Sequence, residues 1–406
     1  MQWKKLSVLL IGLLVLSSFG SAAVSGNKIP LPLAEKAARS YVNWIAANIP
    51  DFKEWENATL GEPVVYYFPN GEKSVYEFAV FKNGKNVGFI LVSARKDMPP
   101  VLEFSKAEPP SWNLEKAKEL AEKKGYKAGK LLYYGALTYG INIGNGKTIG
   151  LRDMKVRKYP MKVELKFNKE RARKEWEKIA NSAITSTKGA VPMSSTPIFI
   201  WNKVYGVPAW TSTDSGDADI QYPNNVGPDP DPWEEWDGCA PISGSMIIAY
   251  YELQLQDDWN REAIIDILHH TMGTLNGGGT LAPQQVTAGI ALFDEEYNQL
   301  LQEGIVSESI SHEFSAYTDF YVSESDVIRE IDDNQPFVLS MNYHWFNGHA
   351  VAVIGYTGWK YNDGGLEYVE LSYIIVHDPN KPGEDDYIAW NDWTSAAASF
   401  ITATEV

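Results

Sequence analysis

Residues 237–251 of this 406-residue chain read DGCAPISGSMIIAYY and contain Cys239, the only cysteine in the sequence. Cys239 stands where a glycine-containing loop enters an apolar segment, and Pro241 suits the first turn of a helix, where a missing N–H removes no hydrogen bond. Met246 and Tyr250 recur at helical spacing and indicate a buried face. A thiol at the start of a helix faces the positive end of the helix dipole, which favours the thiolate. We therefore interpret Cys239 as a candidate catalytic nucleophile, with a buried structural thiol as the alternative.

The first 23 residues are typical of a secretory signal peptide. Lys4 and Lys5 precede an apolar core at 6–16, and GSAA at 20–23 offers small residues for cleavage. The apolar run is shorter than the roughly 18 residues that a membrane span needs. We expect a secreted, extracellular protein with no membrane contact after cleavage, and an uncleaved anchor as the alternative. A lone cysteine excludes an internal disulfide, so an exported chain that keeps a free thiol has a reason to keep it.

Acidic and basic residues are divided between the two halves of the chain. Residues 196–406 carry 34 Asp and Glu but 5 Lys and Arg, whereas residues 1–195 carry 18 and 31. The lysines of the basic half alternate with glutamates and form no compact arginine patch, which argues against nucleic acid as a partner. Attraction between the halves is the simpler explanation, and we expect them to dock on each other. An acidic catalytic half favours basic or neutral substrates.

Residues 24–130 are expected to form a small α+β domain with an antiparallel sheet. The strongest turn signal is Asn83-Gly84, which should join two strands as a hairpin. This domain contains no histidine and no plausible nucleophile, and we assign it no chemistry. The expected elements are helices at 33–49 and 114–124 and strands at 64–68, 75–81, 87–94 and 101–104.

Residues 131–195 are expected to connect this domain to the C-terminal half. The patterns predict strands within 131–143 and at 161–167, then a charged helix at 169–184. Residues 182–197 are rich in Ser, Thr, Gly and Pro, which is typical of a linker and of a site of proteolysis.

Residues 196–406 are expected to form a second α+β domain, helical first and β-rich at its end. The acidic loop at 214–237 is rich in oxygen ligands of the kind that bind calcium. Its spacing matches no EF-hand, which favours a solvated loop, and we predict no cofactor and no metal ligand. The expected elements are a helix from Cys239, helices at 262–270, 283–303 and 324–332, and strands at 337–342, 349–356 and 368–376.

A nucleophilic thiol needs a base and a group that orients the base. His349 follows the turn Asn347-Gly348 and opens an apolar strand, so its ring should lie at the mouth of a buried strand. Asp378 ends the next strand in an Asp-Pro pair, and its carboxylate would fix the tautomer of His349. An ordinary Asp-Pro turn is the alternative for Asp378. Among the other histidines, His344 is a rival base, His377 a weaker one because strand alternation directs it away, and His269, His270 and His312 are expected at the surface.

Taken together, these motifs resemble the papain-like cysteine peptidases, and most closely the branch similar to bacteriocin-processing peptidases. The nucleophile there lies in Gly-Cys-(small)-Pro-(Thr/Ser)-x-x-x-Met, the base in Gly-His-x-x-x-x-x-Gly-Tyr, and the third member in an Asp-Pro. Residues 238–246, 348–356 and 378–379 follow these patterns in the same order. The resemblance implies an α+β papain-like domain at 196–406 in which Cys239, His349 and Asp378 form a catalytic triad that hydrolyses peptide or protein substrates.

Two positions depart from the family pattern. Ile242 stands where a hydroxyl residue is usual. Trp233 stands six residues before the cysteine, where papain-like enzymes have a glutamine whose amide binds the oxyanion, and Gln221 is the nearest glutamine. Losing one oxyanion donor lowers the rate by about two to three orders of magnitude. The departure therefore bears on catalytic efficiency more than on reaction class.

The resemblance also suggests a role for the N-terminal half. The strand at 87–94 looks like part of the pro-regions of secreted cysteine peptidases such as streptopain. A basic pro-region on an acidic enzyme fits the division of charge, because attraction speeds docking. We expect a secreted cysteine endopeptidase made as a zymogen, inhibited by its own pro-domain and cut between 182 and 197. Two alternatives stay open, an acyl transferase or amidase on the same fold and a non-catalytic binding module. Asn57 lies in a glycosylation sequon.

Overall fold

The N-terminal half of the described chain is an antiparallel sheet covered by helices. The structure is a computed structural model that describes residues 26–182, 197–211, 237–275, 279–343, 348–363 and 366–406. Asn83 and Gly84 have φ of 51° and 77°, the two left-handed conformations that a tight type I′ hairpin turn requires. The elements are α1 (Leu31–Asn48), β1 (Thr59–Leu60), β2 (Val64–Tyr67), β3 (Lys73–Lys82), β4 (Lys85–Ser93), β5 (Val101–Ser105), α2 (Leu114–Lys123), β6 (Leu131–Tyr133), β7 (Tyr139–Asn142), β8 (Lys147–Gly150), β9 (Val156–Lys158) and α3 (Lys169–Asn181).

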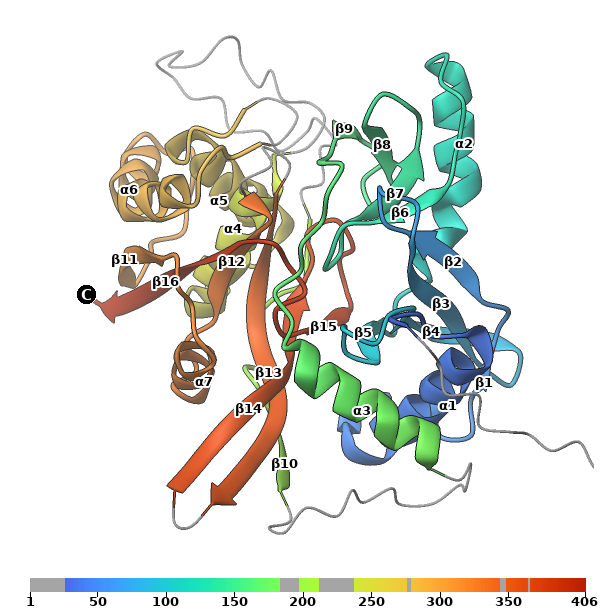
Figure 1. Ribbon diagram of the computed structural model, residues 1–406. Coiled ribbons are helices and arrows are strands. Elements are labelled where there is room, and N and C mark those ends of the chain that lie inside the picture. The colour runs from blue at the N-terminus through green and yellow to red at the C-terminus, as the bar shows by residue number, and fades with distance from the viewer. Residues whose placement is uncertain (1–25, 183–196, 212–236, 276–278, 344–347, 364–365) are drawn as a thin grey trace, which may run out of the picture.

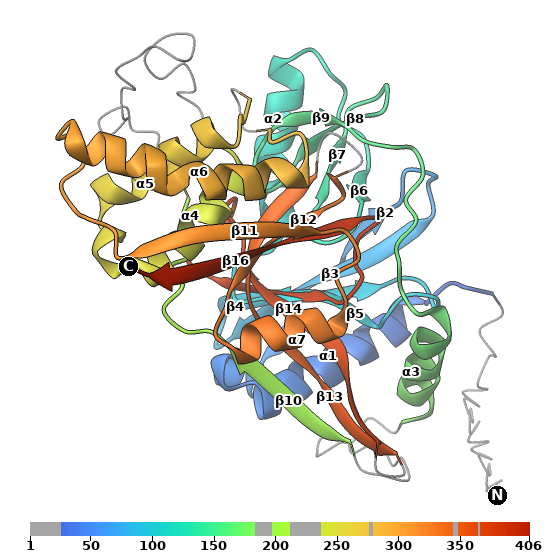
Figure 2. The same cartoon turned by 90° about the vertical axis from the view of Figure 1, so that its left-hand side faces the viewer.

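The C-terminal half places a group of helices against long strands. A helix without charged residues, α4, packs against β12 and β13, and α5 and α6 cover it from outside (Figure 1). The strands β13 and β14 form a long hairpin with α7 and β10 beside it (Figure 2). The elements are β10 (Ile198–Lys203), α4 (Cys239–Tyr251), α5 (Asp258–Thr271), α6 (Pro283–Gln302), β11 (His312–Asp319), α7 (Glu324–Asp332), β12 (Phe337–Met341), β13 (His349–Asp363), β14 (Leu366–His377), β15 (Asp385–Ala389) and β16 (Ala396–Glu405).

One sheet runs through both halves. Its strand order is β11-β16-β12-β13-β14-β15-β5-β4-β3-β2-β6-β7-β8-β9, with β1 paired to β3 and β10 paired to β13. The pairing is antiparallel apart from the contact between Tyr67 of β2 and Leu132 of β6. The two halves join where β5 pairs with β15, with Phe104 opposite Tyr387. In Figure 1 this junction lies between the α4–α6 group on the left and the N-terminal strands on the right.

The junction is built like a protein core. The ring of Phe104 stacks on Tyr387 at 4.6 Å, and Phe52 lies edge-on to both at 5.2 Å. All three side chains are fully or almost fully buried. Aromatic pairs in such geometry stabilise the fold beyond the area that they bury. The halves therefore share a hydrophobic core as well as a sheet.

Ion pairs across the junction agree with the expected attraction between the halves. Arg152, from the turn after β8, contacts Asp378 and Asp386 of the C-terminal half. Arg171 of α3 contacts Glu370 of β14 at 3.2 Å. The basic half thus supplies arginines to acidic residues of the other half.

Several expected elements differ in the structure. Residues 161–167 alternate like a strand but form none, because the segment pairs with no neighbouring strand; Lys166 N–H donates only to Asn391 O, at 3.3 Å. We expected an antiparallel sheet in the N-terminal half and strands at the end of the C-terminal half; the structure joins them in one sheet through β15, which the sequence did not reveal. The short strands β8 and β9 and the outer strands β10, β11 and β16 were missed too. The strands β8, β9 and β15 have only three to five residues, too few to reveal an alternating period, but length does not explain why β10, β11 and β16, with six to ten residues, were missed.

Some expectations lie outside the described residues. The signal peptide, most of the linker at 182–197 and the acidic loop before Asp237 are among them. No helix of the described residues is long and apolar enough to cross a membrane. Asn57 of the glycosylation sequon is exposed.

Replacing Phe104 by Ala should destabilise the whole described fold, because it opens a cavity in the core that the halves share. We expect a loss of about 3–5 kcal/mol in the free energy of unfolding. Tyr321→Ala serves as the control, because Tyr321 is 91% exposed and its loss should change stability by about 0.5 kcal/mol or less. Denaturant unfolding followed by tryptophan fluorescence and by circular dichroism measures both. Separate transitions for the two halves would contradict a shared core.

Candidate active site

The start of α4 fixes the position of Cys239. Gly238 has φ of 111°, a conformation that an L side chain rarely adopts, and its carbonyl accepts the first helical hydrogen bond from Ile242 N–H at 3.2 Å. Ile242, which departs from the family pattern, is fully buried. Its apolar side chain therefore fills space in the core. The sharp turn at Gly238 places the Cys239 side chain at the positive end of the α4 dipole.

Two side chains hold this loop and helix against their neighbours. Ser243 Oγ donates to the carbonyl of Ala350 at 3.2 Å, which ties α4 to the first residues of β13. His269 Nδ1 lies 2.7 Å from the carbonyl of Asp237, two residues before the cysteine. We expected His269 at the surface, and that expectation was wrong: it is 2% exposed on the inner face of α5. The apolar residues Ile264, Ile265, Ile267 and Leu268 before it were the signal for burial.

His349 and Asp378 meet where their strands end. His349 opens β13 opposite Met341 of β12, and Asp378 follows the last residue of β14. The register pairs Ala352 with His377, so the chain beyond β14 continues alongside His349. The Nε2 atom of His349 lies 2.7 Å from Oδ1 of Asp378, and that oxygen also accepts from Asn380 N–H at 2.9 Å.

The thiol of Cys239 lies on the other side of the same ring. It hydrogen-bonds the His349 side chain and the backbone N–H of Ala350. Because Nε2 of His349 bonds to Asp378, Nδ1 is the ring nitrogen that is left to contact Cys239. The structure thus brings together the three residues that the sequence singled out.

Charge in this group favours an ion pair between the thiol and the imidazole. Burial alone would lower the pKa of His349, but the carboxylate of Asp378 and the contact with Cys239 raise it to about 10. Burial would raise the pKa of the Cys239 thiol, but the hydrogen bond and the charge of His349 hold it below its usual value. The pKa of Asp378, which burial would raise, is lowered by His349 and Arg152. A thiolate beside an imidazolium is the reactive state of a cysteine nucleophile.

The other histidines of the described chain have different partners. His377, expected to point away from Asp378, contacts Pro208 O and Asp385. His312, expected in a surface loop, lies on β11 and bonds to the buried Glu252. His344, the rival base, lies outside the described residues.

A cavity of about 320 Å³ opens in front of the thiol. Cys239 and His349 line one wall, and residues of the helical part, such as Leu281 and Pro283, line another. The third wall comes from the N-terminal half and includes Arg157 and Tyr159. We assigned the N-terminal half no chemistry from its sequence, yet its residues line the cavity beside Cys239.

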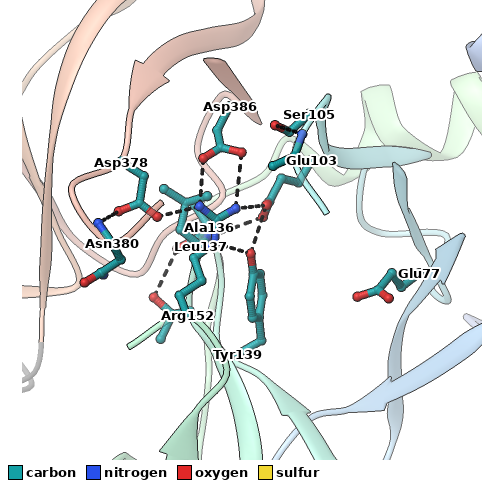
Figure 3. A network of polar contacts seen from close by, with 12 residues as sticks. Glu77, Glu103, Ser105, Ala136, Leu137, Tyr139, Arg152, Asp378, Asn380 and Asp386 are labelled. Atoms are coloured by element: carbon teal, nitrogen blue, oxygen red, sulfur yellow. Dashed lines mark hydrogen bonds and ion pairs between the residues drawn. The ribbon is translucent and has the colours of Figure 1, made fainter. Parts of the chain in front are cut away.

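Arg152 of the N-terminal half contacts Asp378 directly (Figure 3). Its guanidinium contacts Asp378 Oδ2 at 2.5 Å and Asp386 Oδ2 at 2.7 Å. Sequence reasoning missed it because Arg152 stands in a short turn after a four-residue strand, where no spacing relates it to a residue 226 positions later.

Other features of the predicted site are not described. Trp233 and Gln221, on which the oxyanion donor depends, lie outside the described residues, as does the acidic loop considered for calcium. In the described part of the chain, no group of three or more His, Cys, Asp or Glu side chains is arranged to hold a metal ion. The donor that the described chain offers to an oxyanion is the backbone N–H of Cys239 at the start of α4.

Comparison with known proteins points to the same chemistry. Residues 221–405 match the profile of a family described as Peptidase_C39 like family. This match, over just under half of the chain, supports a papain-like cysteine peptidase family. The mixed α+β fold of the C-terminal half is compatible with such a domain. No curated protein matches the chain.

Cys239 should react with iodoacetamide faster than free cysteine at pH values below about 8.5, the ordinary thiol pKa. The reason is that His349 lowers the pKa of the thiol, so the thiolate forms at lower pH. The pH dependence of alkylation, followed by intact mass, measures this. The same protein unfolded in denaturant is the control, since unfolding separates Cys239 from His349. Equal rates in the two states would mean that the thiol is structural.

Proposed function

We propose that this protein is an exported cysteine endopeptidase that hydrolyses peptide bonds with Cys239, His349 and Asp378. The observation that carries the proposal is the contact of His349 with both Cys239 and Asp378 at the edge of a cavity. The family match over residues 221–405 supports the peptidase class. The bacteriocin-processing branch remains a prediction of the sequence motifs.

The geometry suits acyl transfer in two steps. The thiolate of Cys239 attacks the carbonyl carbon of the scissile bond, and the new C–S bond places negative charge on the carbonyl oxygen near the start of α4. His349 gives its proton to the nitrogen of the leaving amine as the C–N bond breaks, and a thioester remains. A water molecule then attacks the thioester, with His349 accepting its proton, and the acid product leaves the regenerated cysteine.

Asp378 has the role of orienting the base. Its carboxylate fixes Nε2 of His349 as a donor and leaves Nδ1 facing the thiol. It also stabilises the imidazolium that pairs with the thiolate. The proton therefore stays on the imidazole until the leaving amine takes it.

Export is part of this proposal, whereas inhibition by the N-terminal half is an expectation from the resemblance alone. The signal peptide at 1–23 supports a secreted enzyme. Cleavage between 182 and 197 and inhibition by the N-terminal half, as in the pro-regions that it resembles, remain predictions. Intact mass and N-terminal sequencing of the secreted active protein test the cleavage.

The purified protein should hydrolyse casein or a mixed peptide library, and Cys239→Ala should abolish that activity. Asp378→Asn should lower kcat by about 10²- to 10⁴-fold while KM changes little, because the base loses its correct orientation. His377→Asn is the matched control, since His377 is a buried histidine whose partners are outside the catalytic group. Product analysis with an added amine separates hydrolysis from acyl transfer to the amine. Tight peptide binding without turnover would instead identify a binding module.

The rate of hydrolysis should fall above about pH 10. His349, whose pKa is raised to about 10, loses there the proton that the leaving amine needs. On the acid side the rate should fall only below the ordinary thiol pKa, since the thiolate persists to lower pH. The profile of kcat/KM against pH for a fluorogenic peptide checks both limbs. A profile that rises steadily through pH 10 would contradict the assignment of His349.

A further inference from the structure

The carboxylate that orients His349 is held from its far side by the N-terminal half of the chain. Asp378 uses Oδ1 for His349 and Oδ2 for Arg152, so one carboxylate joins the base to an arginine from the turn after β8. Neither Arg152 nor Asp378 is exposed beyond 6% of its side chain. The role inferred below for Arg152 rests on the proposed function and deepens it.

Arg152 is saturated by its contacts (Figure 3). Its two Nη atoms donate to Asp378, to both oxygens of Asp386 and to Glu103, and Nε donates to the hydroxyl of Tyr139 at 2.5 Å. A planar guanidinium with every N–H engaged has one orientation. It therefore fixes the Asp378 oxygen that it contacts and, through the rigid carboxylate, the oxygen that faces His349.

The charge of this group makes Arg152 necessary to the C-terminal half. Asp378 and Asp386 belong to the C-terminal half and are at most 1% exposed, and Arg152 is the cation that pairs with both. Removing one partner of a buried ion pair leaves an uncompensated buried charge, which is strongly destabilising. Departure of the N-terminal half would also expose the edge of β15, which pairs with β5.

We propose that Arg152 is a positioning residue of the catalytic group and that the N-terminal half remains part of the active enzyme. Cutting the chain between 182 and 197 is compatible with this role, because β5, Arg152 and Phe104 stay bound without a covalent link. Inhibition relieved by loss of the N-terminal half is not compatible with it.

The variant that tests positioning is Arg152→Met combined with Asp386→Asn, compared with Asp386→Asn alone. Asp386→Asn removes the second buried charge that Arg152 neutralises, and Glu103, whose pKa burial raises to about 8, is able to take up a proton. Asp378 then loses Arg152 and keeps His349 as its one positively charged partner. Arg171→Met is the control for a lost ion pair between the halves, since Arg171 contacts Glu370 away from His349.

Relative to Asp386→Asn, the double variant should lose about 10- to 100-fold in kcat while KM changes less than about twofold. The pKa of Cys239, read from the pH dependence of alkylation, should rise toward that of a free thiol. Arg171→Met should change neither quantity. Equal kcat and equal alkylation profiles for the double variant and Asp386→Asn would overturn the positioning role.

A second measurement uses the wild-type fold. A recognition sequence for a specific protease is inserted between residues 183 and 196, and the purified protein is cut. The two pieces should elute together in size-exclusion chromatography, and peptide hydrolysis should stay within about twofold of the uncut protein. Release of the N-terminal piece with a rise in activity would overturn the proposal and support an inhibitory pro-region. This result is distinct from a failure of the proposed function, in which uncut and cut wild-type protein both lack hydrolysis and Cys239 reacts no faster than free cysteine.

Discussion

One buried guanidinium holds together carboxylates from three strands or strand ends. Glu103 lies on β5, Asp386 on β15 and Asp378 at the end of β14, and all three contact Arg152. Such a group is stable in a low-dielectric interior only when its charges are paired and its hydrogen bonds are made. The pairing of β5 with β15, the position of Asp378 and hence that of His349 all depend on it. The basic character of the N-terminal half has here a concrete structural consequence.

The catalytic group reflects a balance between burial and charge. Burial opposes both the thiolate of Cys239 and the imidazolium of His349, since each charged form is less well solvated inside the protein. The structure opposes this penalty with the helix dipole of α4, the mutual attraction of thiolate and imidazolium, and Asp378 behind the ring. The same arrangement gives the single cysteine of the chain a use as a free thiol. A free thiol would otherwise be a liability in the oxidising environment that the signal-like first residues suggest.

The parts of the fold that sequence reasoning anticipated are those with long regular patterns. The helix at α1, the hairpin of β3 and β4, the helices α6 and α7 and the strands β13 and β14 all carry enough residues to show their period. Short strands such as β8 and β15 do not, and their pairing partners are distant in sequence. Missing β15 concealed the junction of the halves. It thereby concealed Arg152, whose partners are defined only when β5 and β15 are adjacent.

By itself the sequence singled out the three residues of the candidate site. A cysteine at the start of an apolar helix, a histidine opening an apolar strand and an Asp-Pro after the next strand carry local signals, because each depends on neighbours in the chain. Only the tertiary structure decided that the N-terminal half borders the cavity and contacts Asp378 through Arg152. A buried charge is paired with whichever opposite charge the fold brings within hydrogen-bond distance. Arg152 and Asp378 are 226 positions apart, so no local sequence pattern indicates that they pair.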